Sequence, residues 1–122
     1  MFPSTITIND RVPAAKDFKQ IALEDKGSVR MDVSTTNLSP RQMVIRHSTT
    51  SKGVDLVDRH LVQFSTVKID TSGIARTLIV NLTLGVPRNS AIVRTDIDDL
   101  IAFIRNWSGV TANIDGLLIG ES

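Results

Sequence analysis

A run of alternating residues from Ile74 to Val86 constrains the fold of this chain more than any other feature. Its aliphatic side holds Leu78, Val80, Leu82 and Leu84, and its other side holds Thr77, Ile79, Asn81 and Thr83. A period of two belongs to a β-strand whose two sides meet different surroundings. Pro87 follows and ends the strand, because proline cannot donate a ladder hydrogen bond. The run therefore predicts one long strand with an apolar side and a mostly polar side.

Similar patterns upstream predict five more strands. They are Thr5–Ile8, Asp17–Leu23, Ser28–Ser34, Gln42–Thr49 and Arg59–Asp70. The second of these also suits a helical turn, and a strand is preferred because the short first strand needs a partner. The alternation slips after Phe64, which indicates a β-bulge at Ser65–Thr66. The segment Thr71–Gly73 is typical of a tight turn and predicts a hairpin between the last two strands.

Beyond Pro87 the apolar residues recur at helical spacing. They are Ile97, Leu100, Ile101 and Ile104, three or four positions apart, as on one face of an α-helix. Thr95 is the predicted N-cap, with Asp98 three residues later, and Ser108–Gly109 is the predicted end. Thr111–Leu118 is predicted to form one further short helix.

This order of elements predicts an α+β fold with an antiparallel sheet, in a single domain of residues 1–122. Residues 1–24 are expected to form an N-terminal β-hairpin, residues 28–86 the main sheet, and residues 95–118 the two C-terminal helices. A helix of about three turns is too narrow to cover such a sheet. We therefore predict an obligate homodimer, in which a second copy covers the remaining apolar surface.

Composition narrows the class of protein. Hydrophobic residues make up 41% of the 122 residues, enough for a folded core. The sequence has no cysteine, which excludes disulfides and thiolate metal sites. Its apolar runs are too short to span a bilayer, so no membrane partner is expected. Met1–Ser4 lacks the basic and apolar segments of a signal peptide, and we expect the chain to be cytoplasmic where it is made.

Catalysis and metal binding find little support in the sequence. No acid–base pair or activated nucleophile is visible, so the chain is predicted not to be an enzyme and to need no cofactor. His47 and His60 fall on predicted neighbouring strands and could come close, but two imidazoles without cysteine or a carboxylate triad make a poor zinc site. The three aspartates Asp96, Asp98 and Asp99 suit a helix N-terminus better than a calcium loop. No metal site is predicted.

Charge is unevenly distributed along the chain. Residues 1–94 carry 13 basic and 8 acidic side chains, whereas residues 95–122 carry 1 and 5. Such a division arises by chance or reflects a surface that binds an anion. The predicted sheet offers polar candidates for such a surface: Arg30, Gln42, Arg46, Ser48, Arg59, Gln63, Ser65, Asn81 and Thr83. These residue types suit phosphates and exposed bases, but a solvated sheet face carries them too, and the pattern leaves both interpretations open.

The stretch from Ala75 to Ile104 resembles the coat proteins of single-stranded RNA bacteriophages, the leviviruses. In that family a last long strand alternates polar and aliphatic residues, ends at a proline and leads through a turn such as Asn89–Ser90 into a C-terminal helix. Gln42–Thr49 resembles an earlier strand of the family. The resemblance covers residues 41–104 in detail and nearly the whole chain in architecture.

The resemblance implies a role in a virion. Two chains would pair their sheets edge to edge, with each C-terminal helix over the partner's sheet, in an interlocked homodimer. Dimers would assemble into an icosahedral shell around single-stranded genomic RNA in the host bacterial cytoplasm. The protein would also bind an RNA hairpin that overlaps the replicase start, and so repress translation. Family positions that face the RNA correspond to Arg46, Ser48, Asn81 and Thr83. The expected dimer interface comprises Leu82, Leu84, Leu100, Ile101, Ile104 and Trp107.

Two departures from the family pattern bear on these expectations. Ile79 stands where family members can present an aromatic ring to a base, and an aliphatic side chain offers no π-face. The short Thr71–Gly73 turn replaces a longer loop that many members have before the last strand. The alternative hypothesis is a dimeric RNA-binding module that never forms shells.

Overall fold

The computed structural model describes the backbone of residues 1–122 and every side chain except that of Lys52. The chain divides into two compact units, Met1–Pro87 and Arg88–Ser122.

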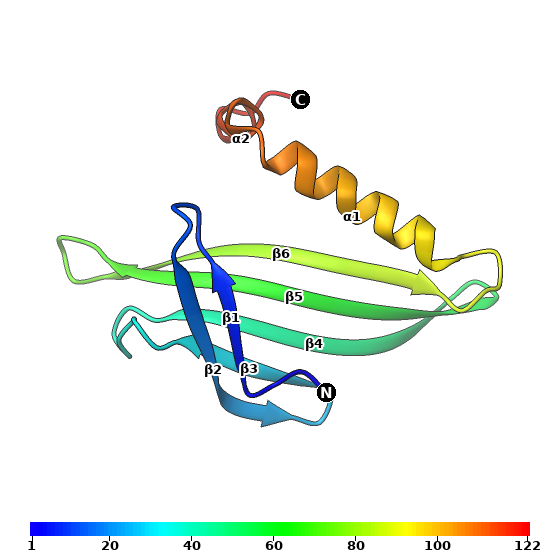
Figure 1. Cartoon of the computed structure of the whole chain (residues 1–122), viewed down its shortest axis with the longest axis horizontal. Helices are drawn as coiled ribbons and strands as arrows, with labels where there is room; N and C mark the ends of the chain where they lie inside the picture. Colours follow the sequence, from blue (N-terminus) through cyan, green and yellow to red (C-terminus); the bar gives the residue numbers. More distant parts are fainter. The chain divides into compact units, whose positions relative to one another are not determined.

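The first unit is a six-stranded antiparallel sheet whose strands follow one another in chain order (Figure 1). The strands are β1 (Thr5–Asn9), β2 (Ala15–Glu24), β3 (Gly27–Asp32), β4 (Arg41–Lys52), β5 (Asp55–Ile69) and β6 (Ala75–Pro87). Each predicted strand is confirmed, with β4 and β5 longer than expected. Their hairpin continues as far as the pair Lys52 and Asp55, where Gly53 adopts a φ of 66° that glycine tolerates without steric cost.

The predicted bulge at Ser65–Thr66 is wrong. Both residues pair in unbroken register with β4 on one side and β6 on the other. The irregularity lies instead in β2, between Gln20 and Ala22, opposite β3. The bulge in β2 reverses the phase of its alternation, so that Phe18 and Glu24 belong to opposite sides of the sheet.

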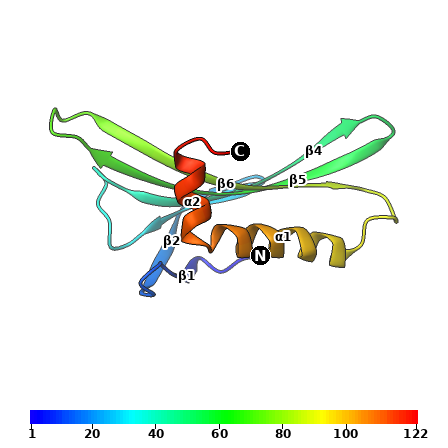
Figure 2. The same cartoon turned by 90° about the horizontal axis from the view of Figure 1, so that it is seen from above.

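The N-terminal β1–β2 hairpin packs on one side of the long strands, which we call the hairpin face. Figure 1 shows β1 and β2 crossing β4 and β5 steeply, and Figure 2 shows them displaced to one side. The core lies here: Phe18, Met43 and Ile45 are buried, with Ile6, Ile8, Val62 and Phe64 packed around them. The rings of Phe18 and Phe64 meet edge to face with centroids 5.7 Å apart. A hydrophobic core thus joins the hairpin to the centre of the sheet.

Strand β3 turns its polar residues toward this same face, which corrects the prediction for Arg30. Arg30 is 2% exposed and donates from Nη2 to the carbonyl oxygen of Pro3 at 2.8 Å and from Nη1 to the Ser28 hydroxyl. Arg30 stands opposite Met43 in the register, so it shares the hairpin face with the core. Its Nη1 and Nη2 atoms donate inside the fold, and its Nε is buried without a hydrogen-bond partner. A guanidinium that is buried and ties down the N-terminal segment is not available to contact RNA.

A second buried polar group lies beside it on β3. Asp32 is fully buried, and Arg41 donates from Nε to its Oδ2 at 2.9 Å, while Nη2 forms an ion pair with the same oxygen at 2.7 Å. The Ser34 backbone N–H and hydroxyl both donate to Oδ1. Burial raises the pKa of Asp32, but these hydrogen bonds together outweigh it and leave the pKa below its ordinary value. The buried carboxylate therefore stays ionised and fixes the β3–β4 connection.

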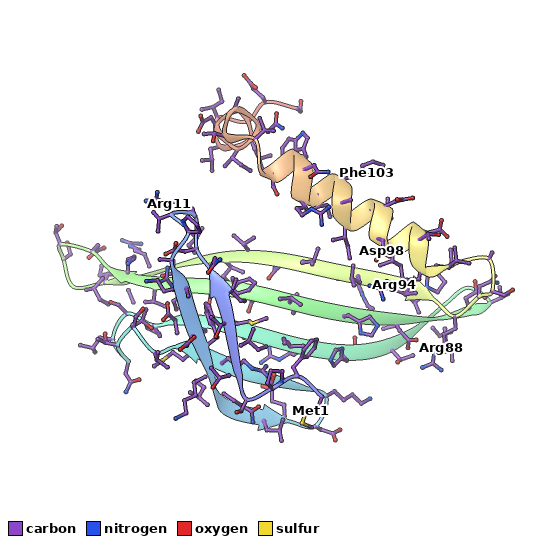
Figure 3. All side chains as sticks on the ribbon, in the orientation of Figure 1. Met1, Arg11, Arg88, Arg94, Asp98 and Phe103 are labelled. Carbon is purple, nitrogen blue, oxygen red and sulfur yellow. The ribbon has the colours of Figure 1, made fainter. Side chains whose placement is uncertain are left out.

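The second unit contains α1 (Arg94–Ser108) and α2 (Thr111–Leu118), as predicted. The expected Thr95 cap is wrong: Val93 is the N-cap residue, and its backbone N–H donates to the Asp96 carboxylate at 3.1 Å. An ion pair joins Arg94 to Asp98 one turn along α1 (Figure 3). The amide of Asn113 donates to the Trp107 carbonyl at 2.9 Å and so connects α2 to the end of α1. No helix in the described part of the chain combines the length and apolarity needed to cross a membrane.

Candidate nucleic-acid interface and assembly surfaces

Seven of the eight predicted RNA-binding residues share the side of the sheet opposite the hairpin, which we call the polar face. They are Gln42, Arg46, Ser48, Arg59, Gln63, Asn81 and Thr83. Residues directly opposite each other on paired strands point to the same side. Gln63 pairs with Asn81, and Ser48 pairs with Arg59, so the register places the set on adjoining strands β4, β5 and β6. The eighth, Arg30, is on the hairpin face.

The polar face is not polar throughout. Val44 and Leu61 lie among the seven, and Val44 is buried. Ile79, opposite Ser65 at one end of the face, is half exposed. The alternation of the last strand already placed Ile79 on this side, whereas Leu61 was not assigned to it, although its even spacing from Arg59 and Gln63 signals the shared side. The surface is therefore a mixture of hydrogen-bonding groups and apolar contact area.

Arg46 has a partner that the sequence did not reveal. Its guanidinium donates two parallel hydrogen bonds to the Glu24 carboxylate, each 3.0 Å long. The Arg46 hydrogen bond is the main cause that lowers the pKa of Glu24. Glu24 reaches this site because it pairs with Gly27, which in turn pairs with Arg46 across β3. Both side chains are well exposed, and such pairs contribute little to stability, so Arg46 can exchange Glu24 for another anion.

Arg59 differs from Arg46 in its surroundings. It is exposed on β5 and makes no ion pair with the side chains that the structure describes. Its cross-strand neighbours are Ser48 and Gly85, so a small hydroxyl lies on one side and a residue without a side chain on the other. Arg59 is therefore the cation of the polar face that is best prepared to contact a phosphate.

Strand β6 forms one edge of the sheet and leaves apolar residues uncovered. It pairs with β5 alone among the described strands. The pairs Val80–Phe64 and Leu82–Val62 place its aliphatic side on the hairpin face, as the alternation predicted. Leu78 and Val80 are nevertheless 64% and 63% exposed, whereas Leu82 and Leu84 are half buried. A long, apolar edge strand with unpaired backbone groups is a template for pairing with another chain.

The helices also present apolar side chains to their surroundings. Leu100, Ile104 and Trp107 of the predicted interface are exposed, and Ile101 is half buried. Phe103 is 67% exposed and projects from α1 (Figure 3). Gly116 alone is buried among the residues described in this unit. An amphipathic helix with its apolar stripe uncovered requires a partner surface.

The two histidines come together, as their strands suggested. His47 and His60 are directly opposite each other on β4 and β5, on the hairpin face, with their Nδ1 atoms 2.9 Å apart. Their rings are steeply inclined, with an interplanar angle of 70°. In this arrangement one ring donates its N–H to the lone pair of the other.

Solved structures with the same fold include chains of two virus-like particles. A chain of the virus-like particle of bacteriophage AVE019 matches with a TM-score of 0.64 and 14% identity, over 96% of this chain and 94% of that one. A chain of the virus-like particle of Beihai levi-like virus 21 matches with a TM-score of 0.68 and 11% identity, over 100% and 98%. No protein-family model and no curated protein matches this sequence. The likenesses confirm the predicted fold class, a six-stranded antiparallel sheet followed by two helices.

Proposed function

We propose that this chain is a viral coat protein that pairs into homodimers, which assemble into an icosahedral shell around single-stranded RNA. The observation that carries the proposal is the uncovered β6 edge with its exposed Leu78 and Val80, in a chain whose fold matches those of two virus-like particles over nearly their whole length. A soluble chain that leaves both an edge strand and an apolar strip exposed needs a cover of matching shape.

A second copy supplies that cover most economically. Two β6 strands related by a two-fold axis would pair antiparallel and join two sheets into one, satisfying the free backbone groups of both. The exposed apolar stripe of α1, which includes Leu100 and Ile104, would then pack over the Leu78–Val80 strip of the partner. Burying each such side chain contributes about 1.5–3 kcal/mol. Trp107 and Leu84 would lie in the same interface.

The polar face is the proposed RNA surface. Helices and hairpin would occupy the other side, which leaves Gln42, Arg46, Ser48, Arg59, Gln63, Asn81 and Thr83 open to the interior of the shell. Phosphates would be held by Arg59, and by Arg46 once it releases Glu24. Amide and hydroxyl groups of Asn81 and Thr83 would contact bases or sugars. Recognition of a specific RNA hairpin, and repression of translation by it, would use this surface with Ile79 packing on a base by apolar contact in place of ring stacking.

Electron microscopy and nucleic-acid analysis of the purified protein test this proposal. We expect closed particles that contain RNA, and dimers as the smallest species when the particles are dissociated. A protein that remains dimeric at every concentration and forms no particles, yet binds RNA, supports the alternative of a dimeric RNA-binding module. A monomer without RNA affinity contradicts both.

A further inference from the structure

We propose that His47 and His60 form a binding site for one divalent late transition-metal ion, with Cu²⁺ bound most tightly. The two side chains are opposite each other on neighbouring strands, and their Nδ1 atoms are 2.9 Å apart. The pair lies on the hairpin face, on the side of the sheet opposite the proposed RNA surface.

The spacing of the nitrogens favours a particular coordination geometry. Two nitrogens at about 2.0–2.1 Å from one ion are about 2.9 Å apart when they subtend a right angle, and about 3.3 Å apart in a tetrahedron. The observed 2.9 Å therefore matches neighbouring positions on a square-planar or octahedral ion. Cu²⁺ and Ni²⁺ adopt such geometries with imidazole ligands, whereas structural zinc requires four tetrahedral ligands. The lack of further protein ligands, which argues against a structural zinc site, therefore does not argue against Cu²⁺ or Ni²⁺.

The strands hold both rings ready for an ion. The β4–β5 register fixes the two Cα atoms opposite each other, so little backbone order remains to be gained on binding. Without an ion, the Nδ1 atoms lie at hydrogen-bond distance, so one ring donates its N–H to the other. To bind one ion through both Nδ1 atoms, the donating ring changes tautomer, its proton passing through solvent from Nδ1 to Nε2, and the rings rotate until both lone pairs point at the ion. His47 is exposed and His60 is half buried, so an ion can reach the pair from solvent.

The charges around the pair favour a cation. The pleat directs the neighbouring Arg46 and Arg59 to the opposite side of the sheet. The next pair along the same side is Thr49 and Asp58, in which the Thr49 hydroxyl donates to the Asp58 carboxylate at 2.9 Å. Leu84 lies opposite His60 on β6 and excludes a further charge on that flank. The Asp58 carboxylate is one cross-strand pair away from the histidines. At that distance it attracts a bound cation but does not occupy the coordination positions left to other ligands.

Calorimetric titration of RNA-free protein with CuCl₂ in a weakly competing buffer tests the site. We expect one Cu²⁺ per chain, with affinity at least tenfold lower in His47→Gln and in His60→Gln. Thr50→Gln places the same new side chain on β4 without touching either ring and serves as the matched control. Circular dichroism of each variant checks that the fold is retained.

Electron paramagnetic resonance of the wild-type protein with one equivalent of Cu²⁺ gives a readout that does not depend on any variant. We expect hyperfine splitting from two imidazole nitrogens. Three results would each overturn the proposal. They are binding of one Cu²⁺ per chain that persists in both histidine variants, a spectrum with a single nitrogen ligand, and the absence of saturable binding.

Discussion

Ile45 on β4 and Val80 on β6 lie on the same side of the same sheet, but Ile45 is 4% exposed and Val80 is 63% exposed. Phe18, Ile6 and Ile8 of the β1–β2 hairpin pack with Ile45 and Met43 in the core. Nothing in the sheet unit covers the outer part of β6 among the described residues. The chain thus completes a core at one end of the sheet and leaves the outer part of β6 uncovered, where the proposed second copy would pack. Under the proposed function, this difference separates residues that fold the chain from residues that would assemble it.

The largest expected effect comes from a charge in the uncovered strip. Val80→Asp leaves the folded chain almost undisturbed, because the side chain is exposed, but it would bury an unpaired carboxylate in the proposed dimer. We expect dimerisation to weaken by about a hundredfold or more and particles to disappear. Sedimentation velocity measures both. The matched control is Val12→Asp in the β1–β2 turn, where exposure is 62%; equal losses in both variants would contradict the assembly role of β6.

A smaller effect is expected within the covered part of the sheet. The pKa of Asp32 is lowered in the folded chain, so its contribution to stability is present above the pKa of the unfolded chain and is lost as the pH falls through the folded value. Asp32→Asn removes the ionised partner of Arg41 and should cost about 1.5–3 kcal/mol at neutral pH. Denaturant titrations between pH 2 and pH 7 measure the difference. We expect the gap between wild type and variant to narrow below pH 4, and a constant gap would remove Asp32 from the acid response.

The unpaired arginine of the polar face should affect RNA binding without affecting assembly of the dimer. Arg59→Gln removes one phosphate contact, so we expect a several-fold loss of RNA affinity and a salt dependence shallower by about one unit of slope. Filter binding across a salt series checks both numbers. Arg105→Gln on α1 removes the same charge from the other unit, and an identical loss there would show that net charge alone is responsible.

The smallest effect is expected from removing the Glu24 carboxylate, which is the anion already bound to Arg46. Glu24→Gln frees the Arg46 guanidinium, and we expect RNA affinity to rise by about twofold, with a steeper salt dependence. Arg46→Ala should lower affinity by less than Arg59→Gln does, because Arg46 must first break its pair with Glu24. The same binding assay measures these variants. Unchanged affinity in both would remove Arg46 from the RNA surface.

The sequence alone was sufficient for the elements and for most of the candidate surface. Alternation in β4, β5 and β6 places seven polar residues on one side because strand register preserves the side of each residue. The prediction failed for Arg30 because β3 alternates as predicted but turns its polar residues toward the core. There Arg30 donates to the Ser28 hydroxyl and the Pro3 carbonyl. Periodicity reveals that two sides exist and cannot tell which one is buried when the polar groups find partners.

Contacts between distant segments were equally hidden. The Arg46–Glu24 pair depends on the bulge in β2, which sets the phase of Glu24, and the sequence pattern placed a bulge in β5 instead. The helix start was misplaced because Asp96 accepts the Val93 backbone N–H, a role that the sequence assigned to Thr95 and Asp98. The closeness of His47 and His60 followed from the strand order, but their 2.9 Å separation required the exact register.

Hydrogen exchange along β6 tests the central claim most directly. About half of its backbone N–H groups point away from β5 and have no partner in the single chain. If a second copy pairs with this edge, amides throughout residues 75–86 exchange slowly in dissociated, RNA-free dimers, and those that point outward lose protection in Val80→Asp. Fast exchange of the outward-pointing amides in the wild-type protein, with slow exchange of the others, would show a free edge and contradict the account.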